Sequence, residues 1–292
     1  TARISGDTAA LTNSAQKSTV ITKDYFAAKD EVLRYFHDYH KVLVLDDFHY
    51  APPDIQYDIA CQLKEVIRLG FKAVIISLPY RSDDAIRLNP DLTGRIFIIE
   101  IDPWKREELI RIAEKGFYVL NITVDKSLML RMAEESIHSP QLMQSICLNI
   151  GLLPENNDVV TENMIEESCR FTCMNLPYAD VVRVLKSGPP TRGQKRLRYH
   201  LTDGSSRDIY SLLLKILADN PPLVELSLEE LMERIRNNMD QNIIKQQKVK
   251  DSLKSWQKLL DSQGSLYQVL EWKDDVIYIL DNMFLFYLRW GI

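Results

Sequence analysis

Two short apolar segments, each ending on polar side chains, constrain the fold of this chain more than any other feature. Val42–Leu45 is followed at once by the acids Asp46 and Asp47, and Ala73–Ser77 ends on the hydroxyl of Ser77. Consecutive apolar residues predict strands that are buried on both faces, as in the interior of a parallel sheet. We therefore expect the two segments to be central strands of one sheet.

The segment between these strands predicts a helix over Asp54–Leu69, because two prolines precede it and a glycine follows it. Strand, helix and strand in this order predict a three-layer α/β unit with a right-handed crossover. We expect a further helix from Asp24 to about Tyr39 and one more strand at Ile96–Ile101. The first part of the chain is thus predicted to be an α/β core.

The two acids after the first strand are candidates for phosphate chemistry. An acid at the carboxyl end of a parallel strand lies at the sheet edge where open α/β folds bind ligands. Asp46 would hold Mg²⁺, mostly through water molecules, and Asp47 would orient or activate the water that attacks a γ-phosphate. The alternative is that both acids only turn the chain and cap the following helix.

The phosphate-binding loop that such chemistry requires has the pattern G-x-x-x-x-G-K-[ST] before a helix, and the sequence contains no match to it. The chain opens on Thr1 and not on Met, and only about 40 residues precede the first strand. We expect the phosphate-binding half to lie in a further segment of a longer chain. The alternative is a degenerate module that does not hydrolyse ATP.

The rest of the chain is predicted to be mainly helical. Three helices are expected at Lys105–Lys115, Asp125–Ser136 and Pro140–Gly151, followed by a helix at Thr161–Met174 and a breaker-rich linker. The last segment predicts the three helices and β-hairpin of a winged helix, at Arg207–Ala218, Ser227–Asn238, Asn242–Ser262, Leu266–Leu270 and Val276–Leu280. The predicted domains are 1–104 (α/β core), 105–152 (helical lid), 153–205 (helix and linker) and 206–292 (winged helix).

In order and spacing these segments resemble an AAA+/STAND-type P-loop ATPase from about Asp24 to Trp290, with the phosphate-binding part absent. KVLVLDDFHY resembles the Walker B element, with Asp47 in place of the usual Glu, and FKAVIIS resembles the sensor 1 strand. The resemblance implies a partial P-loop NTPase core in which Ser77 contacts the γ-phosphate. It also implies an arginine finger for a neighbouring subunit, for which Arg95 is preferred to Arg81, although a surface salt bridge is the simpler reading of either arginine.

The helical lid carries a second part of the resemblance. Ser136-Ile137-His138-Ser139-Pro140-Gln141 resembles the Ser-x-Gly-x-Pro-Arg turn of the sensor 2 helix, with histidine and glutamine in place of the glycine and the arginine. The resemblance implies that Pro140 packs near adenine and that Gln141 stands where the sensor arginine contacts the γ-phosphate. The C-terminal LDNMFLFYLRW resembles the end of archaeal and origin-recognition ATPases, where it closes the winged helix.

The predicted function is an ATP- and Mg²⁺-dependent switch that forms homo-oligomers and is coupled to an effector or sensor domain, in bacterial stress or antiviral defence by analogy. The alternative is a DNA-binding loader or transposition-type regulator whose Arg196, Lys245 and Lys248 contact phosphates. Asp274-Asp275 at the predicted wing tip and a net charge of -5 argue against DNA. A third hypothesis is a scaffold that kept the fold and lost the nucleotide.

Composition narrows the class and the compartment. The 292 residues are 46% hydrophobic and 26% charged, as in an ordinary globular protein. The apolar runs are shorter than the ~18–20 residues of a membrane span, and no apolar signal segment is visible at the start. The four cysteines are dispersed, which favours buried thiols in a reducing cytoplasm over the metal site that Cys169 and Cys173 would otherwise suggest.

Overall fold

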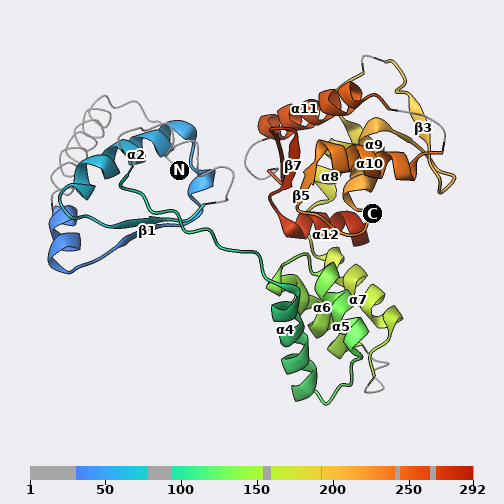
Figure 1. Cartoon of the computed structure of the whole chain (residues 1–292), viewed down its shortest axis with the longest axis horizontal. Coiled ribbons are helices and arrows are strands. Elements are labelled where there is room, and N and C mark those ends of the chain that lie inside the picture. The colour runs from blue at the N-terminus through green and yellow to red at the C-terminus, as the bar shows by residue number, and fades with distance from the viewer. Residues whose placement is uncertain are drawn as a thin grey trace, which may run out of the picture. The chain divides into compact units, whose positions relative to one another are not determined.

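The computed structural model describes residues 31–77, 92, 94–153, 159–191, 193–240, 244–263 and 268–291. The chain divides into two compact units, Thr1–Ile101 and Asp102–Ile292 (Figure 1). The first unit holds the predicted α/β elements, and the second holds the predicted lid, linker and C-terminal segment.

The first unit is built on a pair of parallel strands. β1 (Leu43–Leu45) pairs with β2 (Ala73–Ile75) in parallel, and α2 (Pro53–Ile67) connects them. Figure 1 shows α2 running over the strand pair, with a 3-10 turn, η1 (Phe48–Tyr50), at the exit of β1. The predicted strand–helix–strand order is confirmed. Residues 31–38 are helical, and the earlier part of the helix predicted from Asp24 lies outside the described residues.

The apolar sequence predicts that both faces of these strands are buried. For the described residues this prediction is wrong. α2 buries Ala60, Leu63 and Val66, whereas Val44 is 56% exposed and Val74 is 47% exposed. A strand is covered on both faces only when elements lie on each side of the sheet. Among the described residues, the first unit supplies that cover on one face.

The prediction of a strand at Ile96–Ile101 is also wrong. Residues 96–101 have no regular secondary structure, and Phe97 and Ile101 are each 87% exposed. A strand exists only where a neighbouring strand receives its backbone hydrogen bonds. The described sheet of the first unit ends at β1 and β2, so apolar content alone does not place this segment in it.

The second unit begins with five helices whose starts are set by local capping: α4 (Arg106–Val119), α5 (Lys126–Glu135), α6 (Pro140–Leu152), α7 (Glu162–Met174) and α8 (Ala179–Ser187). The Asp125 carboxylate accepts a hydrogen bond from the Ser127 backbone N–H at 2.8 Å at the start of α5. The Ser139 hydroxyl does the same for Leu142 at the start of α6. Gly116 does not end α4 as predicted, because a helix tolerates an interior glycine at a cost of about 1 kcal/mol.

The remainder of the second unit combines short strands with four helices: β3 (Arg198–His200), β4 (Ser206–Asp208), α9 (Ile209–Leu217), β5 (Glu225–Ser227), α10 (Leu228–Asn238), α11 (Gln246–Gln263), β6 (Leu270–Lys273), β7 (Val276–Ile279) and α12 (Asn282–Trp290). β3 and β4 form an antiparallel pair, and a second antiparallel sheet has the order β5-β7-β6. Positive φ angles of 51° and 62° at Asp274 and Asp275 form the tight turn of the β6–β7 hairpin. The three predicted helices correspond to α9, α10 and α11. The first strand of the predicted hairpin, Leu266–Leu270, is displaced, because β6 begins at Leu270.

One continuous hydrophobic core runs through the whole second unit. It extends from Leu109 in α4 through Ile165 in α7 and Leu213 in α9 to Phe284 in α12. The Trp256 side chain is fully buried, and its indole N–H donates to the Leu185 carbonyl at 2.8 Å. The residues predicted as a separate lid and a separate C-terminal domain therefore share their packing.

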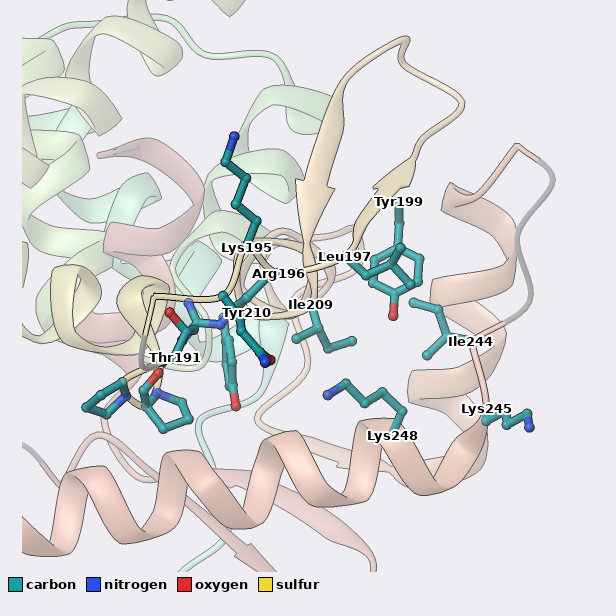
Figure 2. A pocket seen from close by; sticks show the side chains of 13 residues that line it. Thr191, Lys195, Arg196, Leu197, Tyr199, Ile209, Tyr210, Ile244, Lys245 and Lys248 are labelled. Carbon is teal, nitrogen blue, oxygen red and sulfur yellow. Dashed lines mark hydrogen bonds between the residues drawn. The ribbon is translucent and has the colours of Figure 1, made fainter.

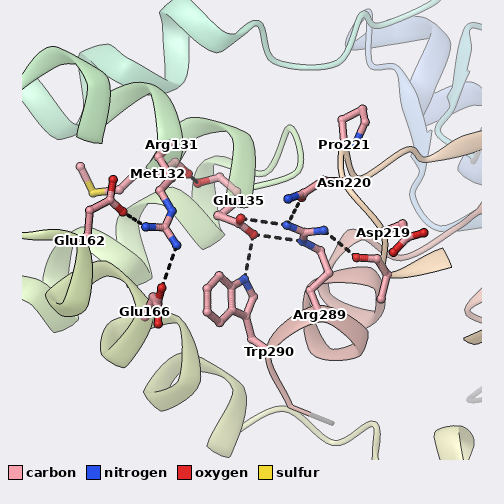
Figure 3. A network of polar contacts seen from close by, with 12 residues as sticks. Arg131, Met132, Glu135, Glu162, Glu166, Asp219, Asn220, Pro221, Arg289 and Trp290 are labelled. Carbon is pink, nitrogen blue, oxygen red and sulfur yellow. Dashed lines mark hydrogen bonds and ion pairs between the residues drawn. The ribbon is translucent and has the colours of Figure 1, made fainter. Parts of the chain in front are cut away.

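A buried ion pair joins α5 to α12 inside this unit. The Arg289 and Glu135 side chains are 7% and 9% exposed, with Nη2 and Oε1 2.8 Å apart. The Trp290 indole N–H donates to the same carboxylate at 2.8 Å, and Arg289 also donates to the Ala218 carbonyl at 2.7 Å. Figure 3 shows the Arg289 guanidinium and the Trp290 indole both directed at the Glu135 carboxylate.

Candidate functional site

The parallel pairing of β1 and β2 brings three predicted site residues to one edge of the sheet. Leu45 is paired with Ile75, so Asp46 and Asp47 leave β1 at the same edge where Ser77 follows β2. Backbone hydrogen bonds continue the pairing past the strands, from the Ile76 N–H to the Leu45 carbonyl at 2.8 Å and from the Phe48 N–H to the Ile76 carbonyl at 3.0 Å. This is the edge at which open α/β sheets bind ligands.

The local conformation after β1 leaves the two carboxylates facing solvent. Asp47 has a left-handed backbone, with φ 53° and ψ 34°, and its N–H donates to the Asp46 carboxylate at 2.9 Å. Asp46 and Asp47 are both exposed. Neither caps the connecting helix, because α2 starts at a proline and has no side-chain cap. The capping alternative is therefore not what the structure shows.

The Ser77 hydroxyl is buried and has no hydrogen-bond partner among the residues that the structure describes. A buried hydroxyl without a partner carries an unmet desolvation cost. With two carboxylates at the same edge, the oxygen atoms suit a hydrated Mg²⁺ ion and a phosphate group better than a dehydrated cation. The donor set is small, since no group of three or more His, Cys, Asp or Glu side chains that could hold a metal occurs in the described part of the chain.

The remaining predicted residues of the nucleotide site are not brought to this edge by any described contact. Arg95 is exposed and follows a turn in which its N–H donates to the Leu92 carbonyl at 3.0 Å. Arg81 lies outside the described residues. Pro140 and Gln141 belong to the second unit, where they form the first turn of α6. Gln141 also lines a hollow of about 230 Å³ between α6 and α7.

A second candidate site lies wholly within the second unit. A cavity of about 630 Å³ is lined by Arg196, Lys245 and Lys248, the three basic residues that the sequence predicts as phosphate contacts, together with Tyr199 and Tyr210. Figure 2 shows the Lys248 amine directed between α11 and the segment above it, whereas the Lys245 side chain points away. The structure thus separates basic residues that the sequence treats alike.

Arg196 is held by the protein itself. Its guanidinium donates to the carbonyls of Ser187 and Pro189, lies 4.8 Å from the centre of the Tyr210 ring and stands 3.8 Å from the Asp208 carboxylate. Two of its N–H donors therefore fix the linker before β3. Its predicted role as a nucleic-acid contact remains a prediction, and the structure adds this positioning role.

The sequence does not single out the two tyrosines of this cavity. Tyr199 and Tyr210 are 7% and 5% exposed. Burial raises the pKa of Tyr199, so its hydroxyl stays protonated and can donate a hydrogen bond. A signal was present in Arg198-Tyr199-His200, where an aromatic residue alternates with basic ones, because alternation in a strand puts the tyrosine on the inner face.

The cysteines differ in burial. Cys147, Cys169 and Cys173 are buried free thiols and Cys61 is partly buried. Burial raises the pKa of Cys147 to about 12 and that of Cys173 to about 12, so both thiols stay protonated and unreactive at neutral pH. Cys173 donates weakly to the Phe286 carbonyl. The prediction of buried thiols is confirmed for Cys147, Cys169 and Cys173, whereas Cys61 is only partly buried.

Comparisons with known proteins give weak likenesses. No protein-family model matches the chain, and no curated protein does. Among solved structures, a Holliday junction branch migration motor, RuvB of Thermotoga maritima, is similar at 14% identity and a TM-score of 0.35, over 82% of this chain and 67% of that one. Cdc6p of Pyrobaculum aerophilum is similar at 12% identity and a TM-score of 0.34, over 85% of this chain and 64% of that one. In the described residues, no helix is both long and apolar enough to cross a membrane.

Proposed function

We propose that the first unit carries the Mg²⁺ and γ-phosphate end of an ATP site of the AAA+/STAND type, and that nucleotide state sets the assembly of homo-oligomers. The observation that carries this proposal is the parallel register of β1 and β2. It gathers two solvent-facing carboxylates and an unpaired buried hydroxyl at one sheet edge of the described structure. The proposal requires a phosphate-binding loop from outside these residues.

The chemistry assigned to each residue follows from its position at that edge. The Asp46 carboxylate would bind the water shell of Mg²⁺. The Asp47 carboxylate would accept a proton from the attacking water or orient it. The Ser77 hydroxyl would donate to a phosphate oxygen and so gain the hydrogen bond that it lacks among the described residues. Arg95 would act on a neighbour's phosphate, and the roles of Pro140 near adenine and of Gln141 at the γ-phosphate stay predictions from the sequence.

Calorimetric titration of Mg-ATP into this chain and into the longest natural form of the protein tests the proposal. We expect the longer form to bind, with Asp46→Ala weakening Mg²⁺-dependent binding about tenfold or more and Asp47→Ala slowing hydrolysis by on the order of 10²-fold. Asp58→Ala, at an exposed carboxylate on α2, is the matched control. Absence of binding in both forms, or an equal loss in the control, would discard the nucleotide site in favour of the scaffold hypothesis.

A second candidate function is DNA binding by a loader or regulator. The order α9, β5, α10, α11, β6, β7 agrees with the predicted winged helix, and Lys248 is open at a cavity beside α11. Against it, two acids, Asp274 and Asp275, form the turn at the predicted wing tip. The Asp275 carboxylate also pairs with Lys250 of α11 and so occupies one of the basic groups that could contact DNA. Salt-dependent duplex binding that is lost in a Lys245→Gln, Lys248→Gln double variant would support this function.

A further inference from the structure

The cavity of the second unit lies between the linker before β3 and residues of the core. Its volume of about 630 Å³ is in the ~300–1,000 Å³ range of small-molecule sites. Its apolar wall is formed by Ile209 and Ile244, which are 3% and 4% exposed. These residues come from the start of α9 and from the approach to α11, so the wall is held by the same continuous core that stabilises the unit.

Three polar groups from different elements are directed into this cavity. Figure 2 shows the hydroxyl ends of Tyr199, from β3, and Tyr210, from α9, directed toward α11, and the amine of Lys248 reaching up from α11. No hydrogen bond or ion pair joins these groups to another described residue. The tyrosine rings are nearly buried, so their hydroxyl positions are fixed by packing and need little ordering when a ligand binds.

The charge at the cavity has one sign. Its described lining contains Lys195, Arg196, Lys245 and Lys248 and no carboxylate. The Asp208 carboxylate stands behind the lining, 3.8 Å from the guanidinium of Arg196. The whole chain carries a net charge of -5, so a cationic cavity is a local departure from the average. The Lys248 ammonium and the two tyrosine hydroxyls can all donate, and the described lining holds no carboxylate to pair with them. Such a cavity favours an anion with several oxygen atoms.

We propose that this cavity binds the phosphate group of a phosphorylated ligand, with Lys248, Tyr199 and Tyr210 as its contacts. The apolar wall formed by Ile209 and Ile244 would lie against the non-phosphate part of the ligand. Arg196 is a positioning residue, because it fixes the linker and lies over the Tyr210 ring. The site does not depend on the nucleotide edge of the first unit, and it goes beyond a basic DNA surface because it assigns two buried tyrosines.

The test uses the full chain with Asp46→Asn and Asp47→Asn, so that the first unit contributes no metal-dependent phosphate site. Inorganic pyrophosphate and a 20-base-pair duplex are titrated separately, without Mg²⁺, at two salt concentrations. Lys248→Gln removes the charge, and Tyr199→Phe with Tyr210→Phe removes only the two hydroxyls. Lys254→Gln is the matched control, because Lys254 is an exposed lysine of α11 outside the cavity lining.

We expect each cavity variant to weaken phosphate binding about tenfold or more, and the control to change it less than about twofold. If pyrophosphate binds, and the cavity variants weaken its binding while the control does not, the ligand is a small phosphorylated molecule. Duplex binding alone with this pattern identifies a nucleic-acid phosphate. The proposal is overturned if neither probe binds, or if Lys248→Gln and the tyrosine pair lose no more affinity than Lys254→Gln. Because the Asp46 and Asp47 carboxylates are already removed, neither result bears on the ATP site of the first unit.

Discussion

The two units contain similar apolar segments but bury them to different extents. In the first unit, Val44 and Val74 lie in regular strands and are still 56% and 47% exposed, because the described sheet has two strands and α2 covers one face. In the second unit, helices and small sheets share one core, and Trp256, Phe284 and Phe286 are fully buried. Local secondary structure therefore forms in both units, whereas among the described residues a closed core is seen in the second unit.

The candidate sites follow the same division. The edge of Asp46, Asp47 and Ser77 consists of loops at the end of a short sheet, with both carboxylates exposed, which suits a site that is completed by other groups. The cavity of Tyr199, Tyr210 and Lys248 is walled by core residues of one unit, which suits a site that exists before its ligand arrives. Binding costs less when the contacting groups are already ordered.

The largest effect expected from this contrast concerns backbone stability. Hydrogen exchange of the whole chain, followed by mass spectrometry, should show amides of α9 and α11 exchanging at least ~100-fold more slowly than those of β1 and β2. The physical reason is that a two-stranded sheet with an exposed apolar face is marginally stable. Equal protection of β1 and α9 would break the comparison and would mean that contacts beyond the strand pair stabilise the first unit.

The next effect concerns the ion pair that joins α5 to α12. Arg289→Met leaves the Glu135 carboxylate buried without its partner, and we expect it to lower the free energy of unfolding of the second unit by about 3–5 kcal/mol. Adding Glu135→Gln should recover part of that loss, because the uncompensated charge is then removed. Urea unfolding monitored by tryptophan fluorescence measures both variants.

The matched control for this pair is Arg183→Met. Arg183 pairs with Asp180 on the surface of α8, where both side chains are largely exposed, so its loss should cost less than about 1 kcal/mol. If Arg289→Met costs no more than this control, then α12 is held to the helical module by apolar packing alone. That outcome would remove the ion pair from the account of how the second unit is joined.

The smallest effect concerns the cap of α10. The Ser227 hydroxyl donates to the Glu230 carboxylate at 2.6 Å and accepts from the Glu230 N–H at 3.3 Å. We expect Ser227→Ala to lower the free energy of unfolding by about 1 kcal/mol at pH 7. Ser255→Ala, within α11 and away from any helix cap, should change it by less than about 0.5 kcal/mol.

This cap also has a defined pH dependence. The hydrogen bonds from Ser227 lower the pKa of Glu230 below its usual value near 4.5. A carboxylate with a depressed pKa in the folded state stabilises the protein above its unfolded pKa and loses that contribution as the pH falls through the folded pKa. The difference between wild type and Ser227→Ala should therefore be larger at pH 7 than at pH 3. Urea unfolding at both values tests this, and an unchanged difference would contradict the role of the Glu230 charge.

Much of the local structure could be predicted from the sequence. Breakers and caps locate α2, α5 and α10 to within a few residues, because these signals act on the neighbouring backbone. The sequence predicts a helix end at Gly116, which is an interior residue of α4, and a strand at Ile96–Ile101, which has no regular structure. Both errors arise because a residue's preference is weak compared with the packing partners it finds.

The candidate sites divide in the same way. That Asp46, Asp47 and Ser77 meet at one edge could be predicted, since parallel strands place their carboxyl ends together. That Lys248, Tyr199 and Tyr210 line one cavity could not be predicted, because these residues are far apart in the sequence and only the docking of α9, β3 and α11 brings them together. For the same reason the sequence could not distinguish Lys248, which points into the cavity, from Lys245, which points away.

Local sequence is enough to place the strand–helix–strand order of β1, α2 and β2, the acids at the end of β1 and the burial of Cys147, Cys169 and Cys173. Each of these depends on neighbouring residues or on hydrophobicity alone. The tertiary structure decided which apolar segments are covered, which basic side chain faces the cavity and how Arg289 of α12 reaches Glu135 of α5. These outcomes depend on contacts between residues distant in the chain. Burial and charge pairing are properties of the packed unit, and local sequence does not specify them.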